Sequence, residues 1–81
     1  MALNGKVVVV TGAARGMGEQ YVRAFLNEGC KVVALDLSWE GVEEFTKELN
    51  SYEESITLSC DISKEADIDA VYREAIERFS T

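Results

Sequence analysis

The sequence predicts an α/β protein of the doubly wound type, in which helices cover both faces of a parallel sheet in three layers. Runs of β-branched residues alternate with segments of helical periodicity, and a glycine-rich turn joins the first run to the first helix. The composition, with 47% hydrophobic and 28% charged residues, is that of a globular domain. Strands that alternate with helices pair in parallel through right-handed crossovers. We therefore expect one partial domain over residues 1–81, in the order β-α-β-α-β-α.

The first unit is a strand over residues 6–11 followed by a helix that begins at Gly16. The strand is a continuous β-branched run ended by Gly12, which is typical of a strand covered on both faces. Gly29 supplies the stop of the helix. The apolar side chains of the helix form one stripe and its neighbours: Met17, Tyr21 and Phe25, with Val22 and Leu26 beside them.

The second unit repeats this pattern, with a buried strand over residues 31–36 and Ser38 as the candidate N-cap of the next helix. The inward residues expected in that helix are Trp39, Val42, Phe45 and Leu49. Residues 55–60 alternate apolar and hydroxyl side chains, which indicates a strand at a sheet edge. Ser63 is then the candidate cap of a last helix. Its apolar stripe is Ile68, Val71 or Tyr72, Ala75 or Ile76, and Phe79.

A complete doubly wound sheet has the strand order 3-2-1-4-5-6, so the first strand should have a neighbour on its other side. The fourth strand and everything after it are absent from these 81 residues. We expect one long apolar sheet edge to lie open. The sequence is therefore interpreted as a truncated or isolated N-terminal segment of a longer protein.

Charge and composition exclude several kinds of partner. The net charge of -7 should repel nucleic acid and anionic lipid, and no segment approaches the ~20 apolar residues that span a bilayer.

The absence of histidine excludes Ser-His-Asp and Cys-His catalysis and imidazole metal ligands. Residues 1–6 show no leader pattern, so we expect a cytoplasmic protein. Cys30 and Cys60 should lie as thiols at opposite ends of neighbouring strands, too far apart for a disulfide.

Residues 11–18 read TGAARGMG and lie between the end of a strand and the start of a helix, where backbone N–H groups can bind phosphate. Gly12 permits a tight turn, and Gly16 lets the backbone approach a pyrophosphate without a Cβ clash. Gly18 allows the helix to pack closely on the sheet. This position predicts a Rossmann-type dinucleotide site, and a purely structural glycine turn is the alternative.

The spacing Thr-Gly-x-x-x-Gly-x-Gly departs from the more common G-x-G-x-x-G and closely resembles the short-chain dehydrogenase/reductase family. Residues 11–18 match every fixed position of that pattern, and the resemblance extends through Asp36 and the pair Asp61-Ile62, so that it covers the whole chain. It implies hydride transfer between a nicotinamide dinucleotide and a small alcohol or carbonyl substrate in the full-length form. A homo-oligomer is possible.

Asp36 ends the second strand, close to the ~20-residue interval after the glycine turn at which a carboxylate reaches the adenosine ribose. The same carboxylate would repel a 2′-phosphate, and neither Leu37 nor Ser38 offers a cation to compensate, which favours NAD over NADP. Arg15 points the other way, because in this family a basic residue before the second glycine often accompanies NADP. Otherwise Arg15 is a solvated loop residue, and Asp36 a cap of the second helix.

The resemblance further implies that Asp61 holds the adenine amino group and that Ile62 lines the adenine pocket. The alternative is that Asp61 stabilises the start of the last helix. Trp39 could cover the adenosine edge, although a core or rim aromatic is favoured. The predicted cofactor-binding residues are Gly12, Ala14, Arg15, Gly16, Met17, Gly18, Asp36, Leu37, Asp61 and Ile62.

The serine, the Tyr-x-x-x-Lys pair and the Asn-Ala-Gly strand end of the family do not occur in this sequence. Tyr21, Tyr52 and Tyr72 are followed four positions later by Phe25, Ile56 and Ile76. We therefore predict no catalytic residue and no metal ligand, and expect the chain alone to be inactive. The alternative function is a standalone dinucleotide-binding or assembly module completed by another chain. Methyltransferases and sugar epimerases are disfavoured by the glycine spacing.

Overall fold

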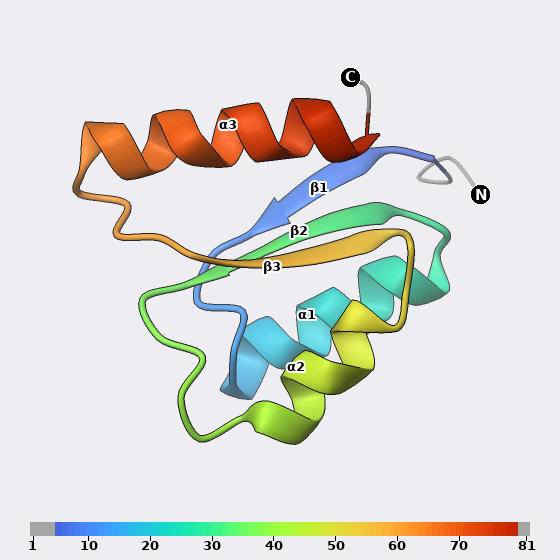
Figure 1. Ribbon diagram of the computed structural model, residues 1–81. Helices are drawn as coiled ribbons and strands as arrows, with labels where there is room; N and C mark the ends of the chain where they lie inside the picture. Colours follow the sequence, from blue (N-terminus) through green and yellow to red (C-terminus); the bar gives the residue numbers. More distant parts are fainter. Residues whose placement is uncertain (1–4, 80–81) are drawn as a thin grey trace.

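The computed structural model describes residues 5–79 and has the α/β architecture that the sequence predicts (Figure 1). Three parallel strands lie side by side in the order β1-β2-β3. The elements follow one another as β1 (Val7–Val10), α1 (Gly16–Asn27), β2 (Lys31–Asp36), α2 (Glu43–Asn50), β3 (Ser55–Ser59) and α3 (Glu65–Phe79). The predicted order of the first three strands of a doubly wound sheet is therefore confirmed.

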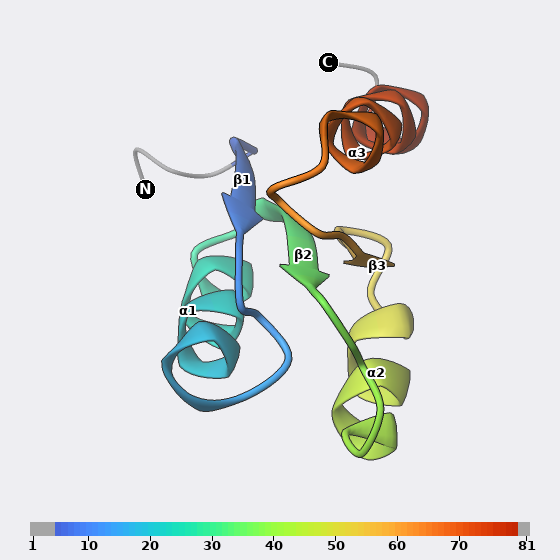
Figure 2. The same cartoon turned by 90° about the vertical axis from the view of Figure 1, so that its left-hand side faces the viewer.

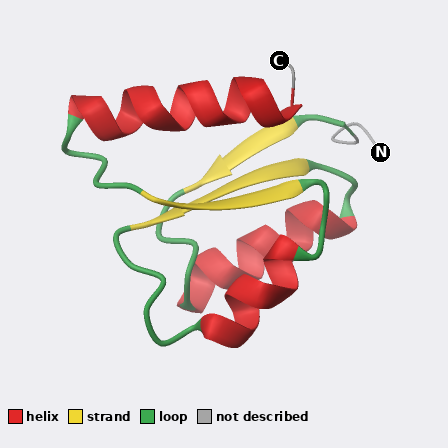
Figure 3. Ribbon diagram, in the orientation of Figure 1, coloured by secondary structure: helices red, strands yellow, loops and turns green. Residues whose placement is uncertain are grey.

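The elements form three layers (Figures 1 and 2). Helices α1 and α2 lie together under one face of the sheet, and α3 crosses the other face alone, as the colouring by secondary structure makes plain (Figure 3). All three loops that leave the carboxyl ends of the strands emerge at one edge of the sheet, because the strands are parallel. Any ligand site built from these loops must lie at that edge.

Strand β2 is the centre of this sheet and is buried on both faces. Val32 and Ala34 pack in the core cluster under α1 and α2, whereas Val33 and Leu35 pack in the cluster under α3. Successive side chains of a strand point to opposite faces, so both faces of β2 are covered. This explains why residues 32–35 form an unbroken apolar run before Asp36.

Strand β1 differs from its prediction, because only one of its faces is fully covered. Val8 and Val10 contribute to the core on the α1 side, but Val9 is 53% exposed on the other. Helix α3 contacts the cluster built on β2 and β3, and β1 lies at the edge of the sheet among the described residues. The expected apolar edge is present.

Helix α1 turns a narrower face to the core than the predicted stripe. Val22 is fully buried, and Phe25 and Leu26 pack partly against the same cluster. Met17 and Tyr21 are 68% and 49% exposed. The packed face is thus centred on Val22, and the predicted Met17–Tyr21 stripe lies outside the core because the sheet extends only as far as β1 on that side.

Helix α2 begins later than predicted, and Ser38 is not its N-cap. The helix starts at Glu43, after Gly41 has adopted a φ of +85°, a left-handed conformation that a right-handed helix cannot include. The Ser38 hydroxyl accepts a hydrogen bond from the Glu40 N–H at 3.1 Å within the preceding loop. Trp39 still packs against the core from this loop, and its indole N–H donates to the Leu58 carbonyl at 3.0 Å, so the favoured core reading of Trp39 is confirmed.

The apolar pattern of helix α3 left open whether Val71 or Tyr72, and whether Ala75 or Ile76, faces the sheet. Val71, Ala75 and Phe79 pack on the sheet, whereas Tyr72 and Ile76 are exposed. The predicted capping role of Ser63 is wrong, because α3 starts at Glu65 and Lys64 is the residue before it, while the Ser63 hydroxyl donates to Asp61. Cys30 and Cys60 are buried thiols and form no disulfide, as predicted.

Candidate site at the carboxyl edge of the sheet

The glycine turn between β1 and α1 presents bare backbone to solvent. Gly12 and Gly16 have φ angles of +62° and +65°, which other residues rarely adopt, and a Cβ built on either would meet nothing within 4 Å. The N-cap residue Arg15 makes no side-chain capping hydrogen bond. The first turn of α1 thus follows an exposed glycine and has no capping side chain, which is the arrangement that anions bind.

Gly18 is required for a different reason. A Cβ at this position would lie on the carbonyl oxygen of Gly12, 2.7 Å from the Gly12 carbonyl carbon and 2.9 Å from the Ala13 Cα. All three are backbone atoms, so no side chain can move aside to make room. Gly18 is thus needed for a close approach, but the atoms it approaches belong to the glycine turn and not, as predicted from the sequence, to the sheet.

Asp36 connects the end of β2 to the glycine turn. Its Oδ2 accepts a hydrogen bond from the Ala14 N–H at 3.0 Å, and the Ser38 N–H lies 3.5 Å from its Oδ1. The alternative role of Asp36 as a cap of α2 is wrong, since that helix starts at Glu43 with Val42 as N-cap. Leu37, the next residue, is 70% exposed.

The ends of the three strands surround a cavity of about 280 Å³. Its lining residues are Thr11, Gly12, Leu35, Asp36, Leu37, Cys60, Asp61 and Ile62. Five predicted cofactor-binding residues are thereby brought together, whereas Ala14, Arg15, Gly16, Met17 and Gly18 lie in the turn and the start of α1 beside it. Sequence reasoning missed Thr11, Leu35 and Cys60 as lining residues, although the rule that ligands collect at strand carboxyl ends could have indicated all three.

Asp61 is held in a tight turn before α3. Its Oδ1 accepts hydrogen bonds from the Ser63 hydroxyl at 2.6 Å and the Ser63 N–H at 3.0 Å, and these two bonds keep the pKa of the Asp61 carboxyl below its ordinary value. The Asp61 N–H donates to Asp67 in the first turn of α3 at 2.9 Å. Asp61 therefore orders the approach to α3 and lines the cavity at once.

Arg15 is exposed at the other side of the turn. Its Nη2 donates to the Glu40 carbonyl at 2.9 Å, so the side chain spans from the glycine turn to the loop before α2. The interpretation as a purely solvated arginine is too simple, since this contact fixes the direction of the guanidinium. Met17, at the start of α1, is exposed beside it.

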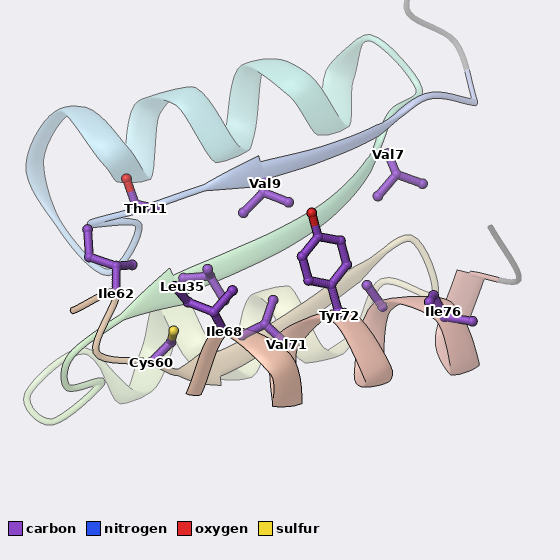
Figure 4. A pocket seen from close by; sticks show the side chains of 11 residues that line it. Val7, Val9, Thr11, Leu35, Cys60, Ile62, Ile68, Val71, Tyr72 and Ile76 are labelled. Atoms are coloured by element: carbon purple, nitrogen blue, oxygen red, sulfur yellow. The ribbon is translucent and has the colours of Figure 1, made fainter. Parts of the chain in front are cut away.

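A second, larger cavity of about 610 Å³ lies between β1 and α3 (Figure 4). Its walls are almost wholly apolar, and Tyr72 reaches from α3 toward β1. Besides Tyr72 the lining residues are Val7, Val9, Thr11, Leu35, Cys60, Ile62, Ile68, Val71, Ala75 and Ile76. Thr11, Leu35, Cys60 and Ile62 line both cavities, so the two meet at the strand ends. We call this larger cavity the β1–α3 groove.

Two further features bear on the kind of site. Within residues 5–79, no three cysteine, aspartate or glutamate side chains gather closely enough to hold a metal ion. No helix in the same range is both long enough and apolar enough to cross a bilayer. The expectation of a cytoplasmic protein depends on residues 1–6, and residues 1–4 lie outside the described part of the chain.

Known proteins match this chain in sequence and in structure. The family model described as short chain dehydrogenase matches residues 6–81. Fluoren-9-ol dehydrogenase of Terrabacter sp. is 40% identical over 77 residues, covering 95% of this chain and 22% of that protein. L-fucose dehydrogenase of Oryctolagus cuniculus is 40% identical over 75 residues, covering 93% of this chain and 25% of that protein.

Solved structures show the same likeness. A short chain dehydrogenase/reductase from Burkholderia phymatum, in complex with NAD, superposes with a TM-score of 0.86 at 28% identity, covering 100% of this chain and 29% of that one. A 3-ketoacyl-(acyl-carrier-protein) reductase from Brucella melitensis, complexed with NADH, gives 0.84 at 38% identity, covering 98% and 32%. The 81 residues thus span between 22% and 32% of the length of these four relatives.

Proposed function

Because the chain belongs to the short chain dehydrogenase family, we propose that it is the nucleotide-binding part of an NAD-dependent oxidoreductase. The observation that carries the proposal is the convergence, at one edge of the sheet, of an open glycine turn and the acidic end of β2 around a cavity. The reaction of the whole protein would transfer a hydride from an alcohol to NAD⁺ and release the hydroxyl proton, giving a carbonyl compound, NADH and H⁺, or run in reverse. The nicotinamide, when bound, accepts or supplies that hydride.

The glycine turn fits a pyrophosphate. Gly12 and Gly16 leave open space where a Cβ would point, and the uncapped first turn of α1 offers N–H groups and the positive end of the helix dipole. Ala14, Arg15, Met17 and Gly18 complete the turn and the start of the helix. The pyrophosphate would lie against backbone, so its binding depends on the shape of the turn more than on any one side chain.

Asp36 fits a ribose with two hydroxyl groups. A carboxylate accepts hydrogen bonds from both hydroxyls, and its charge disfavours a 2′-phosphate on the same sugar. The single nearby cation, among the side chains that bond this part of the turn, is Arg15, which is directed to the Glu40 carbonyl. We therefore propose NAD as the cofactor, with NADP bound more weakly, and Leu37 beside the ribose.

Asp61 and Ile62 fit the adenine end of the nucleotide. Both line the cavity next to Asp36, and the hydrogen bonds from Ser63, which lower the pKa of Asp61, hold its carboxylate in place as an acceptor. Its carboxylate would accept a bond from the adenine amino group, while Ile62 supplies an apolar wall. NAD is bound by a relative of similar structure, which supports the proposal.

In this proposal the chain binds the dinucleotide but does not supply the groups that transfer the substrate proton. No tyrosine of the 81 residues is followed four positions later by lysine, and the matched segment covers only 22% to 32% of the length of the relatives. The residues that handle the substrate proton would lie in the part of such proteins that these 81 residues do not include. The residues that select the substrate, an alcohol or carbonyl compound, would lie in that part as well.

Calorimetric titration with NAD, NADP and AMP tests the proposal on the 81-residue chain and on Asp36→Ala. We expect saturable binding of NAD and AMP, weaker binding of NADP, and a loss of about tenfold or more for NAD in the variant, as for a charged hydrogen bond. Asp69→Ala removes an equal charge from an exposed position on α3 and should bind NAD like the parent. Absence of NAD binding by the folded parent chain would refute the assignment.

The β1–α3 groove favours a second candidate, an assembly module completed by another polypeptide. Val9 is 53% exposed at the open edge of β1, and unpaired edge strands are templates for a further strand. Sedimentation equilibrium of the parent and of Val9→Lys distinguishes the two. Self-association that the lysine abolishes supports assembly, whereas a folded monomer at high concentration leaves the nucleotide-binding part as the description of the chain.

A further inference from the structure

The carboxylate of Asp36 faces two ways. It lines the cavity at the strand ends, and its Oδ2 accepts the Ala14 N–H at 3.0 Å across a separation of 22 residues. The only further contact given for its other oxygen within residues 5–79 is the Ser38 N–H, 3.5 Å from Oδ1, at the outer limit of a hydrogen bond. The stronger bond of Asp36 is therefore made with the glycine turn.

The Ala14 bond belongs to a series that ties the turn to the second strand and its following loop. The Ala13 N–H donates to the Leu35 carbonyl at 2.8 Å, and the Arg15 guanidinium donates to the Glu40 carbonyl at 2.9 Å. Three consecutive residues of the turn are thus each bonded to β2 or to the segment after it. Of the three acceptors only Asp36 is an ionised side chain, and its bond is partly buried, which strengthens it.

We propose that Asp36 is a positioning residue for the pyrophosphate cradle as well as the ribose ligand. Its Oδ2 holds the glycine turn in the shape that receives phosphate, and its Oδ1 is the oxygen left for the ribose hydroxyls. This inference rests on the proposed function and adds to it a direct link between the ribose and phosphate subsites. A single carboxylate prepares one subsite and occupies the other.

A positioning role for Asp36 predicts an effect on pyrophosphate binding that a role as a ribose ligand alone does not. If Asp36 only contacts ribose, its removal leaves a ribose-free anion unaffected, or improves binding because a nearby negative charge is lost. If Asp36 positions the turn, its removal frees the Ala14 amide, and the turn must then be ordered at the moment of binding, which weakens the affinity. Only the positioning role therefore predicts that removal of Asp36 weakens pyrophosphate binding.

Amide hydrogen exchange followed by NMR tests the tether without any ligand. In Asp36→Ala the Ala14 amide should exchange about tenfold faster or more, while the Ala13 amide, bonded to the backbone of β2, should be unchanged. Asp36→Asn retains an acceptor oxygen and should restore most of the protection of Ala14. Equal exchange at Ala14 in the parent and in Asp36→Ala would overturn the proposal. If Asp36→Ala fails to fold, Asp36→Asn compared with Asp36→Ser gives the same comparison.

Titration with inorganic pyrophosphate tests the consequence for binding. We expect Asp36→Ala to bind it at least about fivefold more weakly than the parent, and Asp36→Asn and Asp69→Ala to bind it nearly as well as the parent. Pyrophosphate bound by Asp36→Ala as tightly as by the parent, with NAD still weakened, would overturn the positioning role and leave the proposed function intact. If the Ala14 amide exchanges faster in Asp36→Ala but the parent binds neither NAD nor pyrophosphate, the tether exists and the proposed function is refuted.

Discussion

Gly18→Ala tests whether the glycine turn and the first turn of α1 form one rigid unit. The added Cβ would lie 2.7 Å from the Gly12 carbonyl carbon and 2.9 Å from the Ala13 Cα. Carbon atoms in ordinary contact are about 3.5–4.0 Å apart, so the turn must retreat by roughly 1 Å. Because the hydrogen bonds of Ala13 and Ala14 hold the turn to β2, this retreat also stretches those bonds.

The size of the effect follows from two opposing terms. Overpacking costs about 1–3 kcal/mol, and the upper end applies because the atoms in conflict are all backbone. Alanine in place of glycine inside a helix returns about 1 kcal/mol. We expect the free energy of unfolding to fall by about 2 kcal/mol, which for a domain of this size lowers the Tm by about 10 °C.

Thermal and urea unfolding monitored by circular dichroism measure this change. Gln20→Ala, at an exposed position of the same helix, is the matched control and should stay within about 0.5 kcal/mol of the parent. If Gly18→Ala unfolds at the same temperature as Gln20→Ala, the turn yields without cost and the rigid-unit argument is wrong.

Four further substitutions test other parts of the site and its support. Gly16→Ala and Gly41→Ala both place a Cβ at positive φ with no neighbour within 4 Å, so each should cost about 1–2 kcal/mol of stability, but only Gly16→Ala should weaken NAD binding in calorimetry. Ser63→Ala should raise the pKa of Asp61 toward 3.8 in a carbon-13 NMR titration. A carboxyl whose pKa is lower in the folded than in the unfolded chain stabilises the fold at pH values above its unfolded pKa, and this stabilisation is lost as the pH falls through its folded pKa. The variant should therefore lose less stability than the parent on acidification below about pH 4. A pKa of Asp61 unmoved by that change would contradict the assigned cause. Trp39→Phe should lower stability by about 1 kcal/mol in urea unfolding, because a carbonyl of β3 loses its partly buried donor, and an unchanged midpoint would show that water replaces it.

Much of the fold could be predicted from the sequence because it is encoded in local patterns. The bounds of β2 agree with the predicted residues 31–36, because the apolar run is too short for a helix, follows the helix stop at Gly29 and ends at Asp36. The glycine turn was placed correctly because positive φ angles and strand-to-helix connection both demand glycine at fixed spacing.

The capping predictions failed because each serine has its hydrogen-bond partner in the loop before the helix and not in the first turn of the helix. Ser38 and Ser63 each have the composition of an N-cap, yet both hydroxyls make hydrogen bonds within a loop. Gly41 delayed the start of α2, and its left-handed conformation is visible only once the chain path is known. A cap is therefore a weak signal where a second turn residue lies between it and the apolar stripe.

The sequence by itself determined the order of elements, the position of the phosphate-type turn and the residues that follow each strand, because these depend on spacing along the chain. The tertiary structure alone decided what those residues contact. The Asp36–Ala14 bond joins residues 22 positions apart, and the exposure of Val9 depends on where α3 crosses the sheet. Neither leaves a local trace in the sequence, since parallel pairing, which brings the strand ends to one edge, is a property of the assembled sheet.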